Sequence, residues 1–103
     1  MSTDILSPIH PGEILLEEYL KPLGISRNRL GIALGIPPQR VGEIVKGRRS
    51  VTLDTALRLA KYFGTSPQFW LNMQTQYDLD KARDEHLTER IENEVRPRKE
   101  AFA

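Results

Sequence analysis

The sequence predicts an all-α fold of five helices followed by a charged helical extension. Apolar residues recur three and four positions apart along most of the 103 residues, which is the period of one helix face. Glycine and proline interrupt this pattern at intervals typical of helix ends. No stretch alternates apolar and polar residues as a half-buried strand would, so no sheet is expected.

The first helix is expected to begin near Pro11 and to end at Pro22 and Gly24, because proline suits a first helical position and glycine suits a stop. Its apolar face comprises Ile14, Leu15, Tyr19 and Leu20. Ser26 is the expected N-cap of a second helix, which Gly35 terminates. The core-facing residues of this second helix are Leu30, Ala33 and Leu34.

A third helix is expected to begin at Pro37-Pro38 and to close at Gly47. Its inner face comprises Val41, Ile44 and Val45. The link from the second helix is so short that the two helices must cross at a steep angle. Thr52 caps a fourth helix that stops at Gly64. The predicted buried side of this fourth helix is Leu53, Ala56, Leu57, Ala60 and Phe63.

The fifth helix opens at Ser66-Pro67, and the chain continues over residues 78–95 as a highly charged helix with a thin apolar stripe. That stripe comprises Leu79, Ala82, Leu87, Ile91 and Val95. We therefore expect a domain over residues 1–77 and an extension over residues 78–103. Past Arg96-Pro97 a frayed, disordered tail is expected.

Composition excludes several classes of function. With 39 % apolar and 28 % charged residues, the chain suits one globular domain. It has no cysteine and only two histidines, His10 and His86, so a disulfide, a metal site or a catalytic triad is not expected. We expect His10 to be structural, His86 to be solvated, and the protein to be no enzyme and to bind no cofactor or small molecule. No apolar run approaches the roughly 20 residues that span a bilayer, and no secretory signal is recognisable, so a cytoplasmic, nucleoid-associated protein is expected.

The charge is unevenly distributed, although the net charge is only +1. Residues 25–50 contain six basic residues and one acid, whereas residues 78–100 contain eight acids and six bases. A local basic patch in a near-neutral chain favours a surface that faces a polyanion. The plain alternative is a solvated face on which arginine serves solubility.

Residues 26–47 (SRNRLGIALGIPPQRVGEIVKG) have the pattern of a helix-turn-helix. In DNA-binding proteins of this kind, the first helix crosses the DNA backbone and the second lies in the major groove with its N-terminal residues on base edges. An ordinary helical hairpin has a similar pattern. The pattern and the basic patch together favour DNA binding over that alternative.

The outer face of the third helix holds the predicted base-reading residues, which are Pro38, Gln39, Arg40 and Glu43. Gln39 suits adenine, Arg40 suits guanine or a phosphate, and Glu43 can accept from cytosine or orient Arg40. Gly42 lies on the same face and costs roughly 1 kcal/mol of helix propensity against alanine, so it is expected to permit close approach of DNA or of the second helix. The predicted phosphate-binding residues are Ser26, Arg27, Asn28, Lys46, Arg48 and Arg49.

Three further stretches carry a resemblance to a known family: HPGE at 10–13, ALRLA at 56–60 and TSPQFWLNMQ at 65–74. Residues 26–63 resemble the Xre/Cro-type, lambda-repressor-like helix-turn-helix, and the likeness over roughly residues 9–80 extends to the HigA family of antitoxins. The sequence departs from that family at two places. Gly31 stands where alanine is usual, and Pro37-Pro38 begins the reading helix, where Pro38 offers no side-chain hydrogen bond.

The resemblance implies a homodimer that binds a palindromic operator, represses its own operon and blocks a RelE-like, mRNA-cleaving toxin. It places Gln39, Arg40 and Glu43 at base-reading positions and Arg27 at a phosphate. Two other functions stay open: a stand-alone Xre-type regulator without a toxin partner, and a protein-interaction bundle that does not bind DNA.

The predicted dimer interface lies on the fifth helix and comprises Phe69, Trp70, Met73 and Tyr77. Aromatic residues anchor interfaces, and a small helix-turn-helix protein needs two-fold symmetry to reach two half-sites. Phe69 and Trp70 are expected to contribute to the core as well. For residues 78–103, solvation, extension of the dimer and contact with a toxin stay open.

Overall fold

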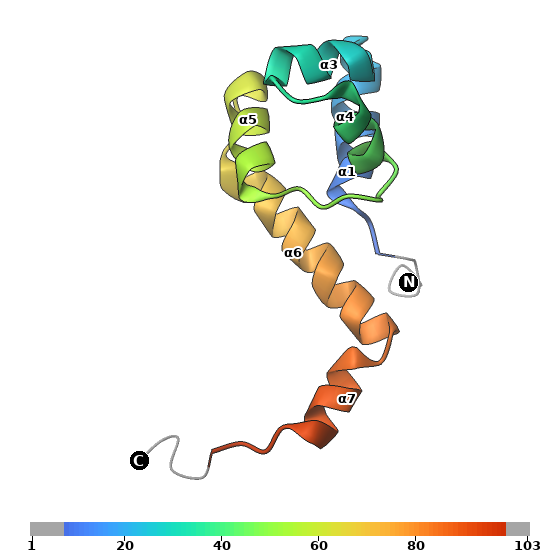
Figure 1. Cartoon of the computed structure of the whole chain (residues 1–103), viewed down its shortest axis with the longest axis vertical. Helices are drawn as coiled ribbons and strands as arrows, with labels where there is room; N and C mark the ends of the chain where they lie inside the picture. Colours follow the sequence, from blue (N-terminus) through green and yellow to red (C-terminus); the bar gives the residue numbers. More distant parts are fainter. Residues whose placement is uncertain (1–7, 99–103) are drawn as a thin grey trace.

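A computed structural model describes residues 8–98, and every regular element within them is a helix. The first helix is continuous but has three parts, α1 (Pro11–Ile14), η2 (Leu15–Leu20) and α2 (Lys21–Leu23). The others are α3 (Arg27–Leu34), α4 (Pro38–Val45), α5 (Leu53–Phe63), α6 (Pro67–Asp84) and α7 (Leu87–Glu94). Figure 1 shows the first helix, α3, α4 and α5 gathered at one end, with α6 leading away from them to α7. The all-α prediction is confirmed, and none of these helices is long and apolar enough to cross a membrane.

The first helix contains a π-helical segment that the sequence did not predict. Leu15 and Leu20, five positions apart, are both buried, and the Lys21 N–H donates to the Leu16 carbonyl five residues back. Pro22 follows directly. Because proline lacks an N–H and its ring crowds the carbonyl four residues earlier, a widened helix before it relieves both problems. The helix ends at Gly24 with φ 67°, as predicted.

The core lies among the first helix, α3, α4, α5 and the first turns of α6. Trp70 is its largest fully buried side chain, and the indole N–H donates to Thr65 Oγ1 at 2.8 Å. The other buried apolar side chains come from the first helix, α3, α4, α5 and the connections between these helices: Leu15, Leu20, Leu30, Leu34, Ile36, Val41, Ile44, Val45, Val51, Ala56, Leu59 and Ala60. The inner face predicted for the third helix is confirmed in full.

Four residues predicted to lie in the core are exposed instead: Ala33 of α3, Leu53 and Leu57 of α5, and Phe69 of α6. In α5 the buried stripe contains Leu59, and leucines on both sides of this helix made the buried side ambiguous from the sequence. In α3 the buried position is Gly31, because α3 and α4 approach each other too closely there for a side chain.

The charged helix predicted over residues 78–95 is interrupted. Helix α6 runs through the predicted boundary at 77/78 to Asp84, and His86, with φ 63°, turns the chain into α7. The N–H groups of Glu85 and His86 cap the last carbonyls of α6, and α7 begins directly after this turn with no buried residue of its own. His86 is exposed as predicted, but it also marks this break. The tail predicted to be disordered extends beyond residue 98, outside the described residues.

Candidate nucleic-acid interface

The outer face of α4 is available to a ligand. Because Val41, Ile44 and Val45 are buried, the remaining side chains of this helix point away from the core. Gln39 is exposed, and the other predicted base-reading residues, Pro38, Arg40 and Glu43, are half-buried. The prediction that this face points outwards is confirmed.

Two glycines fix the position of α4 in the body of the protein. A Cβ atom on Gly31 would lie 2.8 Å from the Cα of Pro38 and 2.9 Å from its nitrogen. A Cβ atom on Gly12, at the start of the first helix, would overlap the carbonyl oxygen of Ile44. Gly31 and Pro38 are the two departures from the family pattern, and the structure brings them into contact. The missing side chain at 31 makes room for the backbone at the start of α4.

The N-terminus of α3 lies beside α4. Ser26 caps α3, and its Oγ accepts from the Arg29 N–H at 3.0 Å, so this hydroxyl already has a partner within the protein. Arg27 and Asn28, in the first turn, are exposed. The guanidinium of Arg27 lies next to Gly42 of α4. The first turn of α3 and the outer face of α4 therefore form one continuous surface.

The basic stretch after α4 borders the same surface. Lys46, Arg48 and Arg49 are exposed, and Gly47 turns the chain with φ 75°. Arg49 Nε donates to Glu43 Oε1 at 2.7 Å. The structure therefore pairs Glu43 with Arg49, and the two roles predicted for Glu43, acceptance from cytosine and orientation of Arg40, stay predictions. The carboxylate is half-buried, and Arg49 offsets its negative charge on a surface otherwise rich in cations.

A buried glutamine fixes the end of this basic stretch to α6. Gln74 Oε1 accepts from the Val51 N–H at 2.8 Å, and Gln74 Nε2 donates to Asp78 Oδ1 at 3.0 Å. Sequence reasoning missed Gln74, because a polar residue on a helix is usually exposed. The available signal was its position four residues after Trp70, on the buried face of the fifth helix.

His10 supports the basic stretch from the other side. Its Nδ1 accepts from the Gly12 N–H at 2.8 Å as the N-cap of the first helix, and its ring lies beside Gly47 and edge-on to Tyr77 at 4.8 Å between centroids. Burial lowers the pKa of His10, and the nearby Asp78 carboxylate offsets part of this effect. The predicted structural role of His10 is confirmed.

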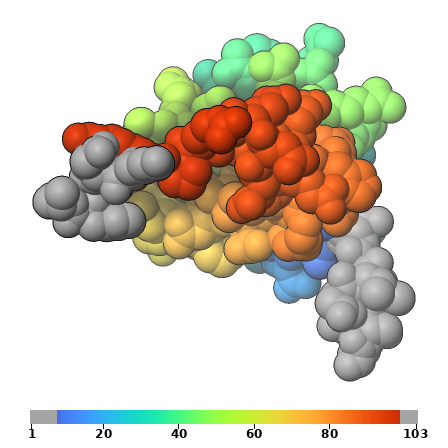
Figure 2. Space-filling view, turned by 90° about the horizontal axis from the view of Figure 1, so that it is seen from below, coloured from blue at the N-terminus to red at the C-terminus, as the bar shows by residue number. Residues whose placement is uncertain are grey.

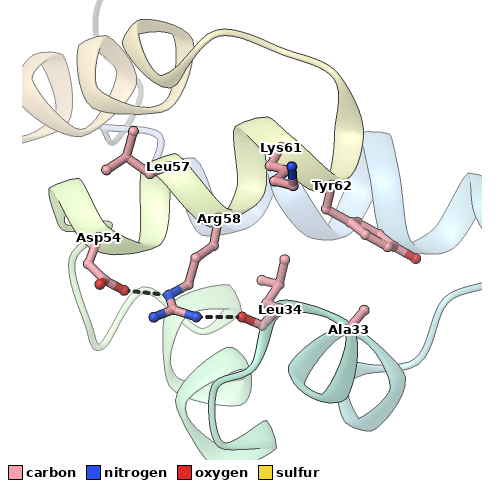
Figure 3. A pocket seen from close by; sticks show the side chains of 7 residues that line it. All are labelled: Ala33, Leu34, Asp54, Leu57, Arg58, Lys61 and Tyr62. Atoms are coloured by element: carbon pink, nitrogen blue, oxygen red, sulfur yellow. Dashed lines mark hydrogen bonds and ion pairs between the residues drawn. The ribbon is translucent and has the colours of Figure 1, made fainter.

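Arg58 ties α5 to the end of α3. It donates from Nε to Asp54 Oδ1 at 2.7 Å and from Nη1 to the Leu34 carbonyl at 2.9 Å, as Figure 3 shows. These residues line an open hollow between α3 and α5, together with Ala33, Leu57, Lys61 and Tyr62. Sequence reasoning missed this role of Arg58, because its backbone partner lies 24 positions earlier in the chain.

The predicted dimer residues differ in exposure. Phe69 is 38 % exposed, and Met73 and Tyr77 are half-buried, so each has surface to offer. Trp70 has no exposed surface, so its predicted contact with a second subunit is wrong: its own subunit encloses the ring completely. In Figure 2, which looks at the end of the molecule away from α3, the end of α6 and α7 occupy the front.

Comparison with known proteins connects this geometry to a family. A helix-turn-helix family model matches residues 16–70. Virulence-associated protein I of Dichelobacter nodosus is 58 % identical over 77 residues, which are 75 % of this chain and 71 % of the relative. An addiction-module antidote protein of the HigA family from Coxiella burnetii, of known structure, is 52 % identical with a TM-score of 0.80, covering 90 % of this chain and all of the other. The chain belongs to the HigA family of antitoxins.

Its helix-turn-helix is therefore that of a family of DNA-binding proteins and not of enzymes. A second HigA structure, the Pseudomonas aeruginosa antitoxin HigA with the higBA promoter, is 43 % identical with a TM-score of 0.80. The match covers 87 % of this chain and 97 % of the other. The likeness to both HigA structures extends beyond the helix-turn-helix to most of the described residues.

Proposed function

We propose that this protein is an operator-binding antitoxin: as a homodimer it binds palindromic DNA upstream of its own gene, represses its operon and neutralises a RelE-like, mRNA-cleaving toxin. The observation that carries the DNA-binding part is the outer face of α4, with exposed Gln39 between the N-terminus of α3 and the basic stretch. The HigA structure with a promoter supports the same function. Operator binding would keep the protein on the nucleoid.

The proposed roles follow from chemistry and position. Gln39 and Arg40 read base edges in the major groove, with Glu43 beside them and Pro38 making at most an apolar contact. Phosphates on the two sides of the groove are held by the first turn of α3 and by the basic stretch after α4. The residues of these two phosphate sites are Ser26, through its neighbouring N–H groups, and Arg27, Asn28, Lys46, Arg48 and Arg49.

DNA binding is tested with a labelled duplex from directly upstream of the gene and a shuffled duplex of equal length. We expect tighter binding to the upstream duplex, with log K falling against log salt by about 0.9 per phosphate neutralised. Gln39→Ala and Arg40→Ala should each reduce discrimination by about 1–3 kcal/mol, whereas Gln76→Ala, exposed on α6, should change nothing. Equal binding of both duplexes would refute operator recognition and favour the protein-interaction bundle.

The proposed dimer uses α6 and the helix that follows it. Phe69, Met73 and Tyr77 line part of α6, and farther along the chain Leu79 and Ile91 are 59 % and 46 % exposed. Light scattering should give twice the monomer mass, and Ile91→Glu should lower the dimer fraction. A monomer that binds the upstream duplex as tightly as expected would contradict the dimer and leave DNA binding intact.

The toxin part of the proposal distinguishes an antitoxin from a stand-alone regulator. Co-expression with the neighbouring gene should yield a stable complex in which RNA cleavage by the neighbour's product is suppressed. If the neighbour encodes no ribonuclease, or if the two products purify separately and cleavage continues, the stand-alone Xre-type regulator is the better description.

A further inference from the structure

Six of the seven glycines have a structural reason within the protein. Four have positive φ angles that end helices or turns: Gly24, Gly35, Gly47 and Gly64. Two others, Gly12 and Gly31, lie against backbone atoms of α4 or of the turn before it, where a Cβ atom would collide. At all six positions, a side chain would strain the fold.

Gly42 is the exception. It lies in the middle of α4 with no positive φ, where a Cβ atom would meet only the side chain of Arg27, at 3.9 Å from Nη1 and 4.0 Å from Cδ. These are ordinary van der Waals contacts, so alanine fits. Of the two explanations predicted from the sequence, close approach of the second helix is wrong, because no backbone atom of α3 lies within 4 Å of this position. Glycine here lowers helix stability by about 1 kcal/mol relative to alanine without any packing gain inside the chain.

We infer that Gly42 and Arg27 form one DNA-contact unit: the bare backbone at 42 admits a sugar–phosphate strand closer than a methyl group would allow, and Arg27 holds that strand from the side. This inference rests on the proposed function. Gly42 lies on the side of α4 that faces the first turn of α3, where free N–H groups and the helix dipole attract a phosphate. The guanidinium beside it is a second phosphate donor at the same place. Both features select the strand at the edge of the groove as the group that approaches.

The first experiment separates stability from binding. Gly42→Ala should melt at a higher temperature than the wild type, yet bind the upstream duplex at least about tenfold more weakly, which corresponds to about 1.4 kcal/mol. Thr75→Ala is the matched control, because it also replaces a helical residue of lower propensity than alanine, at an exposed position of α6 outside the proposed DNA surface. It should bind as the wild type does. A Gly42→Ala protein that is more stable and binds equally well would overturn the inference, and so would one that is less stable.

The second experiment tests the pairing with Arg27. Arg27→Ala should weaken binding and lower the salt slope by about 0.9, and the double variant should lose less affinity than the product of the two single losses. Arg29→Ala, two residues along α3, should combine with Gly42→Ala multiplicatively. If the affinity losses of Arg27→Ala and Gly42→Ala also multiplied in the double variant, the two residues would act independently and the proposed DNA-contact unit would be overturned.

The third experiment identifies the group that approaches. Because a sugar–phosphate strand carries no base sequence, Gly42→Ala should weaken binding to the upstream duplex and to its single-base variants by the same factor. A changed preference at one base pair would overturn the assignment to the strand. A wild type that binds upstream and shuffled duplexes equally would overturn the proposed function and this inference together, whereas failure of Gly42→Ala alone leaves operator binding standing.

Discussion

The helix-turn-helix body and the C-terminal arm, defined here as residues 78–98, differ in how their apolar residues are used. In the body, the apolar stripes of α3, α4 and α5 meet in one core around Trp70. In the arm, Leu79, Ile91 and Val95 are 59 %, 46 % and 60 % exposed. Ile91 lies in α7, and Val95 follows one helical turn later as the C-cap of this helix. The apolar residues of the body are therefore buried within a single chain, whereas those of the arm stay exposed there and stabilise little.

Charged groups differ between the two regions in the same way. The arm pairs neighbours one helical turn apart, such as Lys81 with Glu85 and Arg90 with Glu94, and these pairs are exposed and contribute little to stability. In the body, Arg58 joins α5 to the last turn of α3 through a backbone carbonyl. Its hydrogen bond to Asp54 lowers the pKa of that carboxyl, which keeps the pair charged. Within residues 8–98, the ion pairs of the arm all join residues three or four positions apart, whereas Arg58 in the body connects parts of the chain that are distant in sequence.

The largest difference between body and arm is expected in the free energy of unfolding that is lost when one isoleucine of each region is replaced by alanine. Ile44 in α4 is 1 % exposed and Ile91 in α7 is 46 % exposed. Ile44→Ala should lower the free energy of unfolding by about 2–5 kcal/mol, because it leaves a cavity in a closed core. Ile91→Ala should change it by less than about 0.5 kcal/mol. Denaturant unfolding of monomer at low concentration measures both, and comparable losses would show that the arm is part of the cooperative unit.

The next largest loss of stability is expected at the close contact between the start of the first helix and α4. Gly12→Ala forces a methyl group onto the Ile44 carbonyl and should cost at least the roughly 1–3 kcal/mol typical of overpacking. Gly42→Ala is the control within the same body, because the space at 42 is open and this alanine should raise the melting temperature, whereas Gly12→Ala should lower it. If the two alanines had equal effects on the melting temperature, the close approach of the first helix to α4 would be wrong.

A smaller loss in the free energy of unfolding is expected when Gln74, the glutamine that fixes the basic stretch, is replaced by alanine. Gln74→Ala removes the partner of a buried backbone N–H, that of Val51, and should cost about 1–3 kcal/mol. Gln76→Ala, two positions along α6 and exposed, should cost far less. Hydrogen exchange at Val51 gives a local measure: protection should fall sharply for the first variant only. Unchanged protection would mean that another group holds this loop.

The sequence predicted the body better than the arm, and the reason is periodicity. Helix ends at Gly24, Gly35 and Gly64, and the inner face of α4, follow from local rules that a single stripe of apolar residues makes unambiguous. The same rules failed in α5, where Leu53 and Leu57 extend the apolar face beyond what the core covers. They also failed at His86, because one left-handed residue interrupts a helix without any glycine or proline to signal it.

The residue types at the candidate site were predictable, but their connections were not. The outward direction of Gln39 follows from the burial of its helix neighbours. The pairing of Glu43 with Arg49, and the contact of Gly31 with Pro38, depend on how two helices cross, which no local pattern specifies. Gln74 is the clearest case: its two hydrogen bonds require a loop whose path is set by tertiary structure.

The smallest expected effect, a dependence of stability on pH, arises where the body meets the start of the arm. His10 accepts the Gly12 N–H through Nδ1, so it must be neutral there, and its folded pKa lies below the ordinary 6.5. Between these two values the unfolded chain binds more protons than the folded one. The free energy of unfolding should therefore be highest above about pH 6.5, and should fall as the pH falls through 6.5, until the folded pKa is reached.

A variant without the imidazole isolates this contribution. His10→Asn keeps a side-chain acceptor at the N-cap but does not titrate, so its stability should change less from about pH 7 to about pH 5 than that of the wild type. The groups that face the ring, the Asp78 carboxylate and the Arg49 carbonyl, are present in both proteins and cancel in the comparison. His86 cancels likewise. Equal slopes would mean that protonated His10 is tolerated at the N-cap, with Asp78 compensating in full. A smaller change of the free energy of unfolding with pH in His10→Asn would show that the neutral imidazole of His10 stabilises the fold, where it contacts Gly12, Gly47 and Tyr77.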